Sequence, residues 1–100
     1  MQEFLYRLQA VRGNMLRTSP TDLEQAIVAE HRAYLQDLGA QGVMIFVGRT
    51  LNTDENAMGL AVFRAESEDV ARQIMNDDPA VKRGVMKATL YPFSVFLQAQ

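Results

Sequence analysis

The chain contains no cysteine and a single histidine, His31, and these two facts exclude several kinds of site. Without cysteine the protein has no disulfide framework, no thiolate nucleophile and no zinc site of the usual thiolate kind. A lone histidine also excludes a pair of imidazole ligands at helical spacing. We therefore expect no metal site, and the absence of thiols agrees with a reducing compartment.

Charge of one sign and long apolar runs are also missing. The 10 basic and 12 acidic residues nearly cancel, and no basic stripe could follow phosphates, so nucleic acid is not expected as a partner. No segment approaches the roughly 20 apolar residues that span a bilayer, and the N-terminus lacks the regions of a signal peptide. We expect no membrane contact and a cytoplasmic location.

Glycine-rich phosphate loops and serine nucleophile elbows are absent too, which disfavours nucleotide hydrolysis and acyl transfer. What remains is a chain of 100 residues, 48% of them hydrophobic, without repeats or linkers. This length predicts a single domain over residues 1–100 with a small core. A small core favours the burial of further surface in an oligomer.

Four segments are predicted to be strands. Residues 4–10 alternate between apolar and polar, which is the period of a half-buried strand. Residues 43–47 form a continuous apolar run between glycines, so we expect both faces of that strand to be covered. Residues 58–63 and 86–97 complete the set, and Pro92 predicts that part of the last strand is a sheet edge.

Two segments carry helix signals. The first helix opens at residues 19–22 with Ser19 or Thr21 as the cap, and Glu24 stands three residues after Thr21. Gly39 and Gly42 follow its end. Its apolar stripe contains Leu23, Ile27, His31, Tyr34 and Leu38. Ser67 caps a shorter helix that Pro79 ends. The inner face of the shorter helix is predicted to hold Val70, Ile74 and Met75.

The order strand, helix, strand, strand, helix, strand predicts an α+β, ferredoxin-like βαββαβ fold. In this fold a four-stranded antiparallel sheet carries both helices on one face. The other face is then left with apolar residues such as Phe93, Val95 and Phe96. We expect this face to pack against a second copy in a homodimer, and a higher oligomer stays open.

His31 stands where the helix stripe should be apolar, so its ring needs a hydrogen-bond partner. Asp78, held beside Pro79, is the natural candidate. A ring nitrogen bonded to Asp78 would have a fixed tautomer, which leaves the other nitrogen free to transfer a proton. The same residues also fit a structural core histidine and a simple aspartate-proline turn, with Asp77 as the cap of the helix end.

Four further residues are candidate ligand contacts. Arg12 and Arg49 lie at predicted strand ends, where a guanidinium can bind a carboxylate or phenolate. Tyr6 and Tyr34 can line a cleft between the first strand and the first helix. Each arginine also fits a solvated surface charge, and each tyrosine also fits a core aromatic residue.

Several motifs together resemble the YciI-like (YCII-related) family. They are residues 4–8 (FLYRL), 30–35 (EHRAYL), 47–49 (VGR), 78–85 (DPAVKRGV) and 91–93 (YPF). The resemblance covers nearly the whole chain and implies a dimeric α/β barrel in which two sheets pack together. It also implies an active site with a histidine and an aspartate, roles that fall on His31 and Asp78. Related members include a dehydrochlorinase that acts on chlorinated hydroxyquinol-type rings.

Three functions follow as hypotheses. The first is a small lyase-like or isomerase-like enzyme in which His31, held by Asp78, moves a proton on a small ring or carbonyl compound without a cofactor. The second is a non-catalytic dimer that holds a small metabolite in the same pocket, or an accessory subunit. The third is an oxygenase with His31 as a haem ligand, for which the sequence offers no haem motif.

Overall fold

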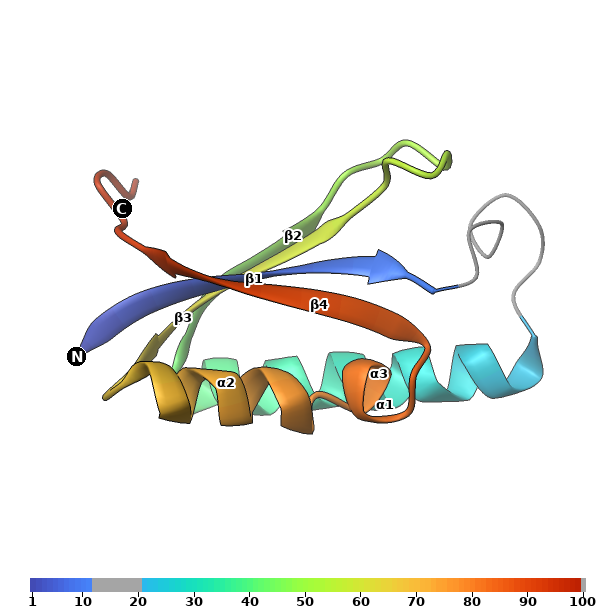
Figure 1. Ribbon diagram of the computed structural model, residues 1–100, viewed down its shortest axis with the longest axis horizontal. Coiled ribbons are helices and arrows are strands. Elements are labelled where there is room, and N and C mark those ends of the chain that lie inside the picture. The colour runs from blue at the N-terminus through green and yellow to red at the C-terminus, as the bar shows by residue number, and fades with distance from the viewer. Residues whose placement is uncertain (12–20, 100) are drawn as a thin grey trace.

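A computed structural model describes residues 1–11 and 21–99. The predicted ligand contact Arg12 and the alternative cap Ser19 lie outside these residues. Four strands and three helices are present (Figure 1). In chain order they are β1 (Gln2–Ala10), α1 (Asp22–Ala40), β2 (Met44–Arg49), β3 (Gly59–Ala65), α2 (Glu68–Asp77), α3 (Pro79–Lys82) and β4 (Met86–Phe93).

The four strands form one antiparallel sheet in the order β2-β3-β1-β4, and the helices form a second layer below it (Figure 1). This arrangement confirms the predicted ferredoxin-like fold. It also confirms that β4 is an edge strand, as Pro92 indicated. Within the described part of the chain, neither long helix is apolar enough over a sufficient length to cross a membrane.

Strand β1 lies at the centre of the sheet and divides its side chains between the two faces. Phe4, Tyr6 and Leu8 are buried toward the helices, whereas Leu5 and Arg7 face the other way. Across the sheet and helices, the buried cluster contains Phe4, Tyr6, Leu8, Leu35, Met44, Ala61, Phe63, Ala65, Ala71 and Met75. We call the sheet face without helices the open face.

The helix starts follow the predicted caps. The Thr21 hydroxyl accepts from the backbone N–H of Glu24 at 3.1 Å, and the Glu24 carboxylate accepts from the backbone N–H of Thr21 at 2.8 Å, so a complete capping box begins α1. Ser67 caps α2 through the backbone N–H of Val70. Gly42, at a φ of 78°, turns the chain from α1 into β2.

Some predictions about burial are wrong. Strand β2 is an edge strand, and Phe46 and Val47 are about half exposed, so its two faces are not both covered within one copy. Leu23 on α1 and Val70 on α2, both predicted to face the core, are also exposed, whereas Leu35 on α1 and Ala71 on α2, which were not predicted, are buried. The last strand ends at Phe93 instead of Leu97.

Phe63 is the best test of the core, because it is fully buried and its ring contacts Phe4 and Tyr6 at centroid distances of 6.1 Å and 5.5 Å. Phe63→Ala should lower the free energy of unfolding by about 3–5 kcal/mol in urea denaturation, since it leaves a cavity. Phe96, which is 96% exposed, provides the matched control. Phe96→Ala should change that free energy by less than about 0.5 kcal/mol, and equal losses in both variants would contradict this core.

Candidate functional site

Asp78 lies at the junction between α2 and α3. Its backbone leaves the helical region at φ −60° and ψ 123°, so α2 ends there, and Pro79 starts α3 at a position where no backbone donor is needed. The Asp78 carboxylate accepts from the backbone N–H of Ala80 at 3.0 Å. Asp78 is thus the N-cap of a short helix that the sequence analysis did not predict.

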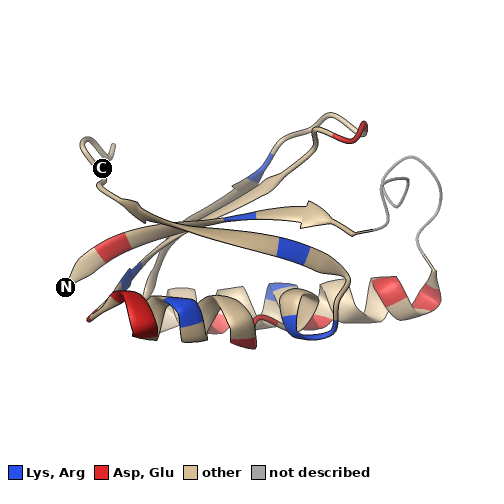
Figure 2. Ribbon diagram, in the orientation of Figure 1, with Lys and Arg blue, Asp and Glu red and all other residues tan. Residues whose placement is uncertain are grey.

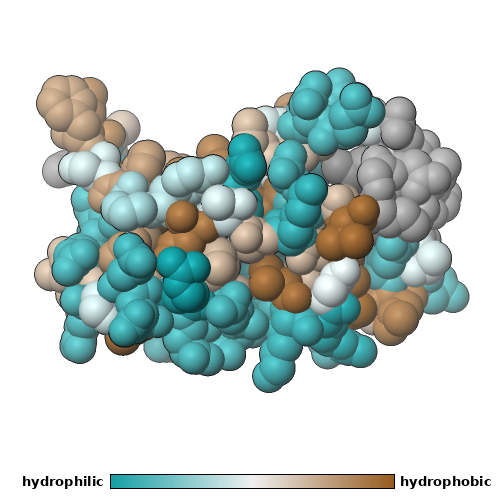
Figure 3. Space-filling model, viewed as in Figure 1, coloured by the Kyte–Doolittle hydropathy of each residue, from teal (hydrophilic) through white to brown (hydrophobic). Residues whose placement is uncertain are grey.

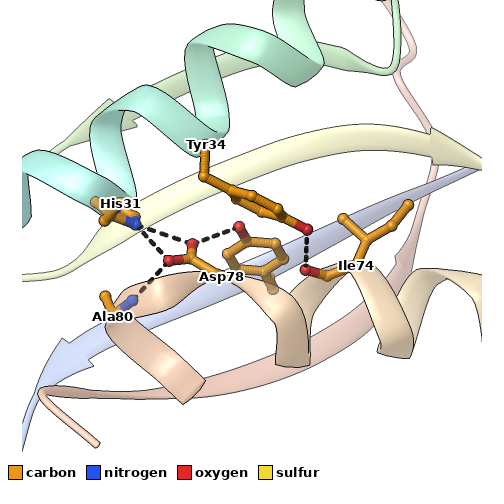
Figure 4. A network of polar contacts seen from close by, with 6 residues as sticks. His31, Tyr34, Ile74, Asp78 and Ala80 are labelled. Carbon is orange, nitrogen blue, oxygen red and sulfur yellow. Dashed lines mark hydrogen bonds and ion pairs between the residues drawn. The ribbon is translucent and has the colours of Figure 1, made fainter. Parts of the chain in front are cut away.

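The buried Asp78 carboxylate also joins two other elements (Figure 4). His31 Nδ1 on α1 lies 2.7 Å from Oδ1 and 2.9 Å from Oδ2. The Tyr6 hydroxyl on β1 donates to Oδ2 at 2.7 Å. Asp78 is 0% exposed and His31 is 8% exposed. A carboxylate without solvent is therefore satisfied by three donors from three different parts of the chain.

The contact with Asp78 fixes the tautomer of His31. A carboxylate only accepts hydrogen bonds, so Nδ1 carries a proton and donates it to Asp78. In the neutral ring Nε2 then holds a lone pair. No described residue supplies a hydrogen-bond partner for Nε2. His31 also lines a cavity, and Nε2 is the ring nitrogen that Asp78 does not engage.

The cavity lies between α1 and the β2 and β3 strands and has a volume of about 660 Å³. Apolar side chains make up most of its wall. Those from α1 and from the helix side of the sheet include Val28, Leu35, Leu8, Met44, Val47 and Met86. Charged or titratable groups enter it at only three described positions, His31, Arg32 and Arg49. Such a space suits a small, mainly apolar ligand with few polar groups.

A β-bulge decides which residues of β2 face this cavity. Met44 pairs with Phe63 and Phe46 pairs with Val62, so Ile45 is an extra residue in β2. Strict alternation from Met44 would turn Arg49 toward the open face. The bulge reverses the alternation, and Arg49, opposite Gly59, lies on the helix side and lines the cavity.

The two tyrosines proposed as ligand contacts do not line the cavity. Tyr6 is fully buried, and burial followed by the charge and hydrogen bond of Asp78 raises its pKa. The Tyr34 hydroxyl donates to the carbonyl of Ile74 at 2.7 Å. Burial, with the charges of Asp77 and Asp78, raises the pKa of Tyr34 to about 12.

The structure therefore brings together His31, Asp78 and Tyr6, and it places Arg49 in the cavity beside His31. Two features were missed. An aromatic residue in an alternating strand looks like any core residue, so nothing marked Tyr6 as a donor to Asp78. The second is Arg32 as a cavity residue. Its only signal in the sequence is that it lies one helical turn after the apolar Val28, and therefore on the same side of α1.

The described residues form no cluster of metal ligands. Among residues 1–11 and 21–99, no three histidine, cysteine, aspartate or glutamate side chains gather closely enough to hold an ion.

Comparisons with known proteins agree with the fold. The sequence profile of the YCII-related domain matches residues 7–94. No curated protein matches the chain. Of the solved structures, 5-chloro-2-hydroxyhydroquinone dehydrochlorinase (TftG) from Burkholderia phenoliruptrix, in complex with 2,5-dihydroxybenzoquinone, is similar with a TM-score of 0.68 and 23% identity. The alignment covers 92% of this chain and 93% of that chain. SnoaB, a cofactor-independent oxygenase from Streptomyces nogalater, is similar with a TM-score of 0.50, 13% identity, and coverage of 98% and 97%.

The raised tyrosine pKa values predict how stability depends on pH. Phenols ionise near pH 10 in the unfolded chain, whereas folded Tyr6 and Tyr34 keep their protons to higher pH. Their contribution is complete below pH 10 and is lost as the pH rises from there through 12. Urea denaturation across this range should show a falling free energy of unfolding. Tyr6→Phe should make the fall less steep than Tyr91→Phe, which removes a more exposed phenol, and equal slopes would contradict the assignment.

Proposed function

Because the chain belongs to the YCII-related family, we propose that it is a small enzyme that transfers a proton on a small ring or carbonyl compound. The observation that carries the proposal is the state of His31. Its Nδ1 is bonded to a buried carboxylate, while Nε2 has no partner in the described structure, and the ring lines an apolar cavity. Both similar structures named above are enzymes by description.

In the proposed reaction, His31 is the catalytic residue and Asp78 is a positioning residue. Neutral His31 accepts a proton from the ligand at Nε2, and the ring becomes an imidazolium. Asp78 stabilises that positive charge, and the proton is then returned to another atom of the ligand or to solvent. Tyr6 and the Ala80 N–H hold the carboxylate in place, so little reorganisation is needed as the charge forms.

A second function uses the same cavity without chemistry. In this alternative the protein is a dimeric module that holds a small metabolite, or an accessory subunit. The apolar wall of the cavity supports binding in either case, so a direct test of proton transfer must separate the two functions. No cofactor enters either proposal.

Deuterium exchange tests the proton transfer before the substrate is known. The protein is incubated in D₂O with a pool of small ring and carbonyl compounds, and mass spectrometry follows which compounds gain deuterium at carbon. His31→Ala should slow the exchange by about 10²- to 10⁴-fold, as expected for the loss of a positioned base. Asp78→Asn should also slow it, because asparagine does not compensate the imidazolium charge.

Tyr34→Phe is the matched control for these variants. It changes a side chain one turn further along α1 that does not line the cavity, so exchange should continue at nearly the original rate. All variants must first show a cooperative thermal transition. A folded His31→Ala protein that exchanges deuterium at the original rate would exclude His31 as the base. Ligand binding without exchange in any variant would favour the alternative.

We also propose that the open face packs against a second copy. Phe46, Tyr91 and Phe93 remain 40–49% exposed on or beside this face. In Figure 3 the helix layer is mainly hydrophilic, whereas the C-terminal tail, which stands on the side of the sheet away from the helices, is apolar. Arg7 lies on the same face of β1, and its Nε is buried within one copy without a hydrogen-bond partner among the described residues.

Tyr91→Glu tests this interface. A carboxylate at this position would be buried without a partner in the dimer but is exposed to water in a monomer, so the variant should be monomeric by light scattering at micromolar concentration. Val70→Glu introduces the same charge at a residue of similar exposure on α2, on the opposite side of the molecule, and should remain dimeric. A monomeric unaltered protein would refute the dimer.

A further inference from the structure

We propose that the ligand of this cavity carries a planar oxyanion, a carboxylate or an ionised phenol, on an apolar body, and that Arg32 and Arg49 bind this oxyanion. The proposal deepens the proposed function, on which it rests for the reacting site at His31, by naming a substrate class.

The first support is the charge of the cavity wall. Apart from His31, its described charged side chains are two arginines, and no aspartate or glutamate among the described residues lines it. His31 and Asp78 form a pair whose charges compensate when the ring is protonated. The net charge offered to a ligand is therefore that of the two guanidinium groups, and an anion is the complementary partner.

The second support is that neither arginine has a side-chain partner among the described residues. Elsewhere on the helices, Arg72 pairs with Glu68 and Arg83 pairs with Glu30. Arg32 and Arg49 make no side-chain hydrogen bond or ion pair in the described structure. The acidic residues of the loop after β2, Asp54 and Glu55, form no ion pair with either arginine among the described residues. Their donors are free for a ligand.

The third support is their placement on opposite walls. Arg32 comes from α1, directly after His31, and Arg49 comes from the end of β2, where the bulge at Ile45 turns it to the helix side. Figure 2 shows basic positions both on α1 and near the end of β2. Both side chains are exposed, so they lie at the opening and leave the apolar interior to the body of the ligand. Planar guanidinium groups bind carboxylates and phenolates with two parallel hydrogen bonds.

Matched pairs of probes test the charge preference without any turnover. Benzoate is compared with benzamide, and 4-nitrophenolate is compared with 4-nitroanisole, so that each pair differs mainly in charge. Dissociation constants are measured by titration of the protein's amide resonances. Each anion should bind at least about 10-fold more tightly than its neutral partner, as expected for two charge-assisted contacts. Inorganic phosphate, which has no apolar body, should not displace benzoate.

Variants then assign the preference to residues. Arg32→Gln and Arg49→Gln should each weaken binding of the anions by about 3- to 10-fold and leave the neutral probes nearly unchanged. Arg49→Lys keeps the charge but loses the planar fork. It should bind the anions more tightly than Arg49→Gln and more weakly than the unaltered protein. Arg72→Gln on α2 is the control and should bind all probes as the unaltered protein does.

Three results would overturn the proposal. They are equal affinity for anions and neutral partners, no anion binding at millimolar concentration, or unchanged anion binding in both Gln variants. Displacement of benzoate by phosphate would overturn the role of the apolar body. His31→Ala separates this proposal from the catalytic one, because it should slow deuterium exchange by about 10²- to 10⁴-fold while the anion preference changes less than about 2-fold. Deuterium exchange without an anion preference would be consistent with the proposed enzyme function but would refute the arginine site.

Discussion

The fold and the site both depend on one buried carboxylate. Asp78 has no exposed surface, and a buried carboxylate without partners would cost several kcal/mol. Its three donors belong to β1, α1 and the first turn of α3. The same contacts that make the burial tolerable therefore also fix the position of α1 over the sheet. Because of this, the orientation of His31 is a consequence of how the protein packs.

The sequence predicted best those features that local chemistry decides. Strand alternation and capping residues located the elements, and the rule that a buried ring needs a partner led from His31 to Asp78. The sequence was less informative about features that tertiary contacts determine. A continuous apolar run looks the same whether the chain itself or a second copy covers it, so the exposure of β2 was missed. The four-residue helix after Pro79 is too short for any periodicity, and the side on which Arg49 lies depends on a bulge that composition does not reveal.

The two faces of the sheet have different chemistry because β1 alternates. One set of its side chains, ending in Tyr6 and Leu8, supports Asp78 and borders the cavity, and the other set, with Leu5 and Arg7, forms the open face. The site and the proposed interface are thus separated by a single strand thickness. Changes on the open face can therefore alter the proposed association while the hydrogen bonds of Asp78 are preserved, since the side chains of the two faces point in opposite directions.

The extra residue at Ile45 has a consequence for how such proteins diverge. An edge strand tolerates the gain or loss of one residue more easily than a central strand, since it has a neighbour on only one side. Here one extra residue reverses the two sides of the strand end. Residues that would otherwise point toward the open face point toward the cavity, and the reverse. A similar strand without the extra residue would turn the residue at the position of Arg49 away from the cavity. An alignment without a gap at this position would equate residues that point in opposite directions.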